Sequence, residues 1–200
     1  MTNPIDFYFD FSSPYGYLAS HRIDKIAERH GRAVTWRPYL MGVVFKISGR
    51  TPLPELPLVG DYARRDFARC ARLHGVPFNA PSRLPISGVA ASRAYYWLYD
   101  QDAQKAKVLA QALYGAFFVD DQNIAEPDVV ASITESVGVA SGAVTAALQD
   151  ADVKNRLRQE TDAAIARGVF GSPYVVVDDE PFWGNDRLEQ VDRWLETGGW

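Results

Sequence analysis

The sequence predicts an α/β fold in which both ends of the chain contribute strands to one sheet and the middle forms a helical insertion. Residues 5–11 and 33–39 alternate apolar and polar side chains around a helical segment, and residues 173–183 contain two more strand-like runs before a last helix. From residue 89 to residue 168 the pattern is helical almost throughout. Because two or three strands need a partner face to form a core, we expect the β-α-β and β-β-α ends to combine into one sheet.

The N-terminal unit is predicted from its change of periodicity. A first strand at residues 5–11 is followed by a helix with one buried face at residues 15–30, which Gly31 ends, and by a second strand at residues 33–39. A connection of this length most easily joins parallel strands of one sheet through a right-handed crossover. We therefore expect these two strands to be parallel.

The central part divides into two loops and a series of helices. Glycine and proline in residues 40–57 favour a loop or a short helical piece, and the proline-rich residues 75–88 favour a second loop. Residues 61–74 between them have the spacing of an amphipathic helix with arginines on its exposed face. Five further helices are expected at residues 89–100, 103–119, 126–137, 141–149 and 151–167.

The C-terminal end returns to strand signals. Residues 173–177 are expected to form a strand, residues 178–180 a hairpin turn and residues 181–183 a second strand. The final helix is expected at residues 185–197, and Asp186 with Glu189 three positions later has the spacing of a capping box.

Composition excludes several classes of function. The chain has 200 residues, 47% of them hydrophobic, and a net charge of −4, so there is no electrostatic case for a nucleic-acid or membrane partner. No apolar stretch is long enough to span a bilayer and the N-terminus lacks a basic segment followed by an apolar one, so we expect a cytoplasmic protein. Cys70 is the single cysteine, on the apolar stripe of its helix, which indicates an inert core thiol. His21, His30 and His74 lack ligand spacing, so no metal site is expected.

Ser13 lies where the first strand turns into a helix. Pro14 suits the first turn of a helix and Ser13 precedes it as a natural N-cap. Unpaired N–H groups and the positive end of the helix dipole meet at such a turn, which favours an anion there. On residue types alone, Ser13 either caps its helix only or also serves a site.

Three motifs in order carry a resemblance to a known superfamily. They lie at residues 6–14, 169–173 and 183–188. The arrangement resembles the thioredoxin fold of disulfide oxidoreductases, with residues 1–40 plus 168–200 as the thioredoxin-like domain and residues 41–167 as an inserted helical domain. Ser13 and Gly16 occupy the places of the two redox cysteines, so disulfide exchange is excluded. The serine version is similar to the kappa-class glutathione transferases and, more closely, to the 2-hydroxychromene-2-carboxylate isomerases.

This resemblance implies glutathione as cofactor. Ser13 would donate a hydrogen bond that stabilises the thiolate rather than attack, while Ser12 should point to the opposite face. Ser172 and Pro173 resemble a cis-proline turn that pairs with the cysteinyl backbone, although an ordinary trans proline remains open. Four residues would hold the γ-glutamyl end, with capping or core packing as their alternative roles: Trp183, Gly184, Asn185 and Asp186.

The resemblance also implies a substrate and an assembly. The substrate would be an aromatic 2-oxo acid from ring-fission catabolism, whose carboxylate Lys46 or Arg50 would bind, unless both are solvated surface charges. Relatives often carry asparagine where Arg50 stands and lysine where Val59 stands, which leaves the exact substrate open. A kappa-like transferase and a non-catalytic binding module are the competing hypotheses. A homodimer is expected from the resemblance alone.

Overall fold

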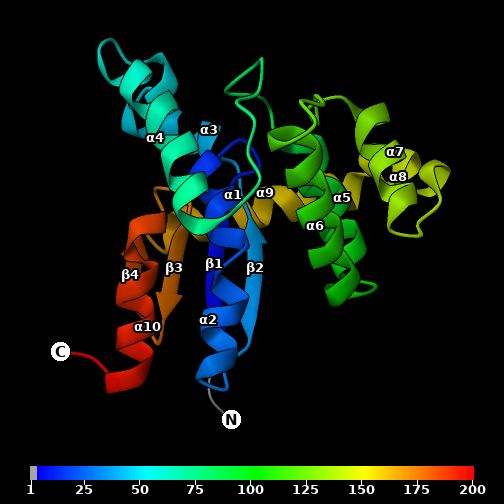
Figure 1. Ribbon diagram of the computed structural model, residues 1–200. Helices are drawn as coiled ribbons and strands as arrows, with labels where there is room; N and C mark the ends of the chain where they lie inside the picture. The colour runs from blue at the N-terminus through cyan, green and yellow to red at the C-terminus, as the bar shows by residue number, and fades with distance from the viewer. Residues whose placement is uncertain (1–3) are drawn as a thin grey trace.

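The computed structural model describes residues 4–200 and contains a four-stranded mixed sheet (Figure 1). The strand order is β2-β1-β3-β4. β1 (Ile5–Phe9) pairs in parallel with β2 (Val34–Pro38) and antiparallel with β3 (Tyr174–Val177), which in turn pairs antiparallel with β4 (Glu180–Trp183). The two ends of the chain therefore share one sheet with β1 and β3 at its centre, as predicted.

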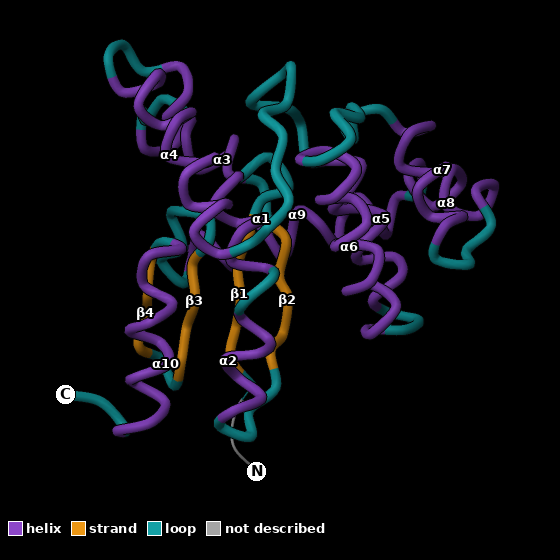
Figure 2. The backbone as a smooth tube through the Cα atoms, in the orientation of Figure 1, coloured by secondary structure: helices purple, strands orange, loops and turns teal. Residues whose placement is uncertain are grey.

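The helices surround this sheet and extend beyond its top in Figure 1, and Figure 2 separates them from the loops. At the chain ends they are α1 (Pro14–Ser20), α2 (Ile23–Arg29), the 3-10 turn η2 (Asn185–Arg187) and α10 (Leu188–Thr197). The middle of the chain forms α3 (Met41–Ser48), η1 (Leu53–Glu55), α4 (Val59–His74), α5 (Val89–Tyr99), α6 (Ala103–Phe118), α7 (Pro127–Ser136), α8 (Ser141–Gln149) and α9 (Ala151–Ala166).

Strand alternation divides the core between the two faces of the sheet. Phe7 and Phe9 point to the face covered by α2 and α10, where they pack with Trp36 in the larger buried cluster. Tyr8 points to the other face, where it packs with Tyr39 beneath α9. β1 is buried along its whole length, so the turn that follows it is anchored on both sides.

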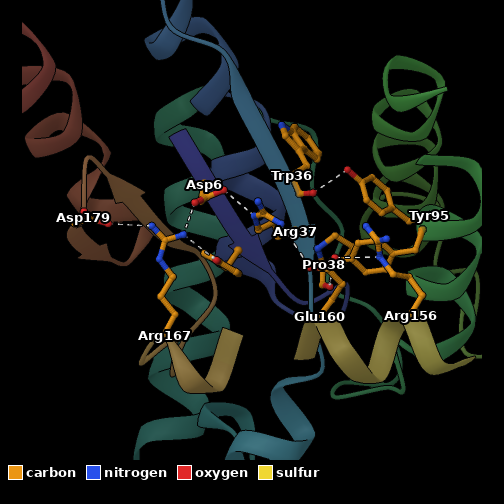
Figure 3. A network of polar contacts seen from close by, with 11 residues as sticks. Asp6, Trp36, Arg37, Pro38, Tyr95, Arg156, Glu160, Arg167 and Asp179 are labelled. Carbon is orange, nitrogen blue, oxygen red and sulfur yellow. Dashed lines mark hydrogen bonds and ion pairs between the residues drawn. The ribbon is translucent and has the colours of Figure 1, made fainter. Parts of the chain in front are cut away.

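Ion pairs fasten α9 to the second face of the sheet, as Figure 3 shows. Asp6 accepts from Arg37 at 2.7 Å and also pairs with Arg167, just beyond the end of α9. Glu160 of α9 pairs with Arg37 at 3.5 Å and with Arg156 at 3.0 Å. Asp6 lies near the start of β1 and Arg37 lies opposite Tyr8 on β2, so these pairs run along the sheet and hold the helical segment against it.

The helix predicted at residues 15–30 is two helices, and the prediction of one was wrong. The nitrogen Nε2 of Gln111 on α6 donates to the carbonyl oxygen of Ser20 at 2.9 Å. That carbonyl is the one a continuous helix would offer to residue 24, so a residue distant in sequence interrupts the ladder. The chain turns at His21 and Arg22 before α2 begins.

Two further predictions are settled by the structure. The predicted capping box at Asp186 is wrong, because neither η2 nor α10 has a side-chain cap hydrogen bond. The helical alternative for residues 40–57 is confirmed, since α3 and η1 lie there and Gly49 ends α3 with a φ of 67°. The proposed domain boundaries at residues 40 and 168 stay a prediction, and residues 1–3 of the first segment lie outside the described residues.

Candidate functional site

Ser13 stands at the start of α1, directly after the turn that ends β1. Its backbone is extended, and its hydroxyl oxygen accepts a hydrogen bond from the Gly16 N–H at 3.0 Å. The predicted N-cap is therefore confirmed. The Ser13 hydroxyl donates in turn to the carbonyl oxygen of Ser172 at 2.8 Å. The hydroxyl proton therefore points toward the loop before β3, and the site is formed between this turn and that loop.

The loop before β3 is held from three sides. The Ser172–Pro173 peptide bond is cis. The hydroxyl oxygen of Ser172 accepts from the Asp10 N–H at 2.9 Å, and the Pro173 carbonyl accepts from the Gly184 N–H at 3.1 Å. The Tyr39 hydroxyl donates to the Gly171 carbonyl at 2.8 Å inside the core. The residues that directly follow β1, β2 and β4 thus each hold this loop in place beside Ser13.

Gly16 has no room for a side chain. A Cβ built there would lie 2.7 Å from Oγ of Ser172 and 2.9 Å from the hydroxyl oxygen of Tyr114. A cysteine side chain at this position would displace the Ser172 or Tyr114 hydroxyl. The packing around Gly16 thus agrees with the absence of a cysteine pair.

An aromatic wall lies beside the cis-proline loop. The indole of Trp183 is 52% exposed and crosses Gly171 so closely that a Cβ there would meet its Nε1 at 2.0 Å. Phe170 packs against Trp183 with ring centroids 4.8 Å apart, and the guanidinium carbon of Arg50 lies 5.5 Å from the Phe170 ring. The structure therefore brings Arg50 to this wall. Lys46 is exposed on α3, and no hydrogen bond or ion pair joins it to another described residue.

The two polar residues of η2 differ in orientation. Asn185 is 4% exposed, and its side-chain amide lies 3.5 Å from Arg22 and 3.4 Å from His74. Asp186 faces outward, with its side chain 73% exposed and paired with Arg187 at 2.6 Å. Only Asp186 presents its side chain to solvent. A cleft of about 320 Å³ beside Arg22 and His74 is lined by α2, the end of α4 and α10, and Ser13 is not part of it.

α4 packs against α1 through Tyr15, which contacts Asp66 and Phe67. The Tyr15 hydroxyl donates to the Asp66 carboxylate at 2.5 Å, and burial together with this carboxylate raises the pKa of Tyr15 far above its ordinary value. Cys70 is half-buried, with its sulfur 3.5 Å from the same carboxylate. Burial and Asp66 raise the pKa of Cys70, so it stays a thiol, although it lies at the edge of the core rather than inside it as predicted.

Asp10 is the residue that the sequence motifs contained but to which no role was given. It is 6% exposed, and its carboxylate accepts from the Ser12 N–H at 2.7 Å and the Met41 N–H at 2.9 Å. Burial raises the pKa of Asp10 to about 6. A charged residue at the end of an apolar strand was the available signal, because carboxylates are seldom fully buried without a partner.

Comparison with known proteins places this geometry in a family. The profile of the DSBA-like thioredoxin domain matches residues 4–196. A 2-hydroxychromene-2-carboxylate isomerase from Pseudomonas putida is 32% identical over 94% of this chain and 92% of its own. This chain belongs to the DSBA-like thioredoxin family and, within it, to the 2-hydroxychromene-2-carboxylate isomerases. The predicted resemblance to the thioredoxin-fold superfamily and the predicted resemblance to the isomerases are both confirmed.

Structural comparison agrees with that membership. The solved structure of a 2-hydroxychromene-2-carboxylate isomerase superposes with a TM-score of 0.87 at 28% identity, covering 97% of this chain and 95% of the other. Glutathione S-transferase kappa 2 from Caenorhabditis elegans is 26% identical over 96% of this chain and 91% of its own length. No helix within residues 4–200 is long and apolar enough to cross a membrane. Over the same residues, no group of three or more His, Cys, Asp or Glu side chains could hold a metal ion.

Proposed function

We propose that the protein is a glutathione-dependent isomerase of an aromatic 2-oxo acid, of the 2-hydroxychromene-2-carboxylate type, in aromatic-compound catabolism. The observation that carries this proposal is the Ser13 hydroxyl, which lies at the start of α1 and faces the cis-proline loop in a chain without a cysteine pair. Relatives named for this isomerase match almost the whole chain. Bound glutathione would supply a thiolate that adds reversibly to the conjugated 2-oxo acid and lets its former double bond rotate.

Ser13 would hold that sulfur as a thiolate. Its hydroxyl turns from the Ser172 carbonyl to the sulfur, while the N–H groups at the start of α1 add their partial positive charge. These donors lower the pKa of a thiol and so raise the thiolate fraction at neutral pH. The released Ser172 carbonyl is then free to accept from the cysteinyl N–H of glutathione, as in an added strand.

The γ-glutamyl end would bind beside η2. Asp186 offers an exposed carboxylate to the ammonium group, and Trp183 with Gly184 forms the adjacent wall. Asn185 supports this arrangement from inside, because its side chain faces Arg22 and His74.

The substrate carboxylate would bind Arg50, which stands over Phe170 at the aromatic wall. Reversing its charge, Arg50→Glu, should raise the KM for 2-hydroxychromene-2-carboxylate about tenfold while kcat changes little, because a charged contact made equally in ground and transition states is lost. Steady-state kinetics measure both constants. Lys46→Glu is the matched control on α3, and its effect should be smaller. An unchanged KM in both variants would show that neither Arg50 nor Lys46 binds the substrate carboxylate.

Two assays test the proposed function. Titration calorimetry of the wild type with glutathione should give micromolar-to-millimolar binding, and no binding would exclude every glutathione-dependent function. The second assay follows 2-hydroxychromene-2-carboxylate spectrally beside the conjugation of chlorodinitrobenzene. Conjugation without isomerisation would favour a kappa-like transferase, the alternative that the kappa relatives support. Glutathione binding without either activity would leave a non-catalytic binding module.

The proposal extends to location and assembly. Free thiols such as glutathione persist in reducing compartments, and we place the protein in the cytoplasm on that ground and on the resemblance. The homodimer rests on the resemblance alone, and sedimentation equilibrium tests it. The small-molecule aromatic 2-oxo acid is the proposed partner, with no nucleic acid or membrane.

A further inference from the structure

Asp10 is bonded to each of the segments that build the site. Its carboxylate accepts from the N–H of Ser12 through one oxygen, at 2.7 Å, and from the N–H of Met41 through the other, at 2.9 Å. Its own N–H donates to Oγ of Ser172, and its carbonyl accepts from the N–H of Ser13 at 2.9 Å. One residue therefore connects the Ser13 turn, the cis-proline loop and the start of α3.

The contact with Met41 reaches the segment that leads to Arg50. Met41 is the first residue of α3, whose other end continues into the Gly49–Arg50 turn beside Phe170. A carboxylate is favoured at this end of a helix, because the first N–H groups have no partner within the helix. Leu40, the N-cap residue, has no side-chain cap hydrogen bond, so the Asp10 carboxylate takes the place of the cap.

Among the described residues, the charge of Asp10 has no counter-ion. No salt bridge to Asp10 is found among residues 4–200. The titratable groups that face it are the phenols of Tyr39 on the β2 side and Tyr114 on α6, whose pKa values burial raises well above 10, so both stay neutral. Gly88, the uncharged residue before α5, lies beside the carboxylate, since a Cβ built on it would stand 3.4 Å from Oδ1 of Asp10. The ionised carboxylate is therefore stabilised directly by two backbone N–H groups, those of Ser12 and Met41.

We propose that ionised Asp10 is a positioning residue that holds the Ser13 turn and the first turn of α3 in one arrangement, and that its protonation loosens the site. Each carboxylate oxygen faces one N–H donor, so a proton on either oxygen weakens one of the two bonds. Burial brings the pKa of Asp10 to about 6, within reach of ordinary assay conditions. This inference rests on the proposed function and concerns the regulation of the same site.

The decisive variant is Asp10→Asn, which replaces one acceptor oxygen by a donor and so imitates the protonated state. We expect kcat/KM to be about tenfold below wild type at about pH 8, because one hydrogen bond to a charged group is lost. The ratio of wild type to variant should fall toward one below about pH 6, where wild-type Asp10 is itself protonated. Taking the ratio cancels the ionisation of the glutathione thiol, which both proteins share.

Stability should move in the opposite direction. Because burial raises the pKa of Asp10 from 3.8 to about 6, the folded wild type holds this proton more tightly than the unfolded chain. The wild type should therefore lose stability relative to Asp10→Asn as the pH rises from about 4 to about 6, while its relative activity increases. Urea unfolding of both proteins over this range measures the difference. A residue with a purely structural role would not give opposite trends.

Asp6→Asn is the matched control, since Asp6 is a buried carboxylate on β1, four residues before Asp10, and binds arginines instead. Its activity ratio should not vary with pH. In the wild type itself, the amide resonances of Ser12 and Met41 should titrate together near pH 6, which needs no variant. A constant Asp10→Asn ratio, or amide resonances that do not titrate, overturns the inference. Failure of the wild type to bind glutathione would instead overturn the proposed function.

Discussion

Replacing Ser13 by alanine should lower the turnover of 2-hydroxychromene-2-carboxylate by about 100-fold or more, the usual loss when one donor to a developing negative charge is removed. Glutathione should still bind within a few-fold of wild type, because the cis-proline loop, Trp183 and Asp186 remain. The pKa of the bound thiol should rise, since its hydroxyl donor is gone. Thiolate absorbance of the complex as a function of pH, together with calorimetry and steady-state kinetics, separates these effects.

The Ser13→Ala variant also loses a helix cap, which by itself costs about 1 kcal/mol of stability. Ser13→Asp separates the two roles, because aspartate caps a helix well but offers no hydroxyl donor and repels a thiolate. We expect the helix cap to be retained and turnover to be lost, together with the hydrogen bond from position 13 to the Ser172 carbonyl. Ser12→Ala is the control, since Ser12 binds the Ile86 N–H on another segment, and it should retain most activity. Full turnover by Ser13→Ala would reduce Ser13 to its capping role.

Replacing Gly171 by alanine should displace Trp183 from the cis-proline loop. The added Cβ would lie 2.0 Å from Nε1 of Trp183, and the half-exposed indole can swing outward more easily than the buried loop can move. We expect glutathione binding about tenfold weaker, with 1–3 kcal/mol of stability lost at most, the usual cost of overpacking. Calorimetry measures the affinity, and tryptophan fluorescence reports the displacement.

A double-mutant cycle identifies the cause. Trp183→Ala alone should weaken glutathione binding by a similar factor, and adding Gly171→Ala to that variant should then change little, because the colliding side chain is absent. If the two substitutions weaken binding additively, alanine at position 171 acts on the loop itself and not by displacing Trp183. An unchanged affinity in Trp183→Ala would show that the aromatic wall has no part in the site.

Most elements were predictable because their signals are local. α4 to α9 lie close to their predicted bounds, since each has an apolar stripe at helical spacing and several begin or end at a proline, aspartate or glycine. The Ser13 cap was equally local, because it needs only a serine before a proline and an N–H within the next turn. Both strands at each end followed from alternation or from short β-branched runs.

The failures have a common origin in contacts between distant residues. The break between α1 and α2 depends on Gln111, which lies on α6. No feature of residues 15–30 predicts this break. The capping box at Asp186 failed because a 3-10 turn precedes α10 and the carboxylate pairs with Arg187 instead. Asn185 points inward because its side-chain amide forms polar contacts with Arg22 and His74.

By itself, the sequence determined the order of the elements, the chain-end origin of the sheet, and a serine turn that has no cysteine to exchange. These follow from periodicity and residue type, which act over a few neighbouring positions. Only the tertiary structure decided that Ser13 donates to Ser172, that Arg50 reaches Phe170, and that Asp10 joins three segments of the site. The reason is that hydrogen bonds and packing act over a few ångströms in space, and folding alone brings residues 10, 41 and 172 within that range.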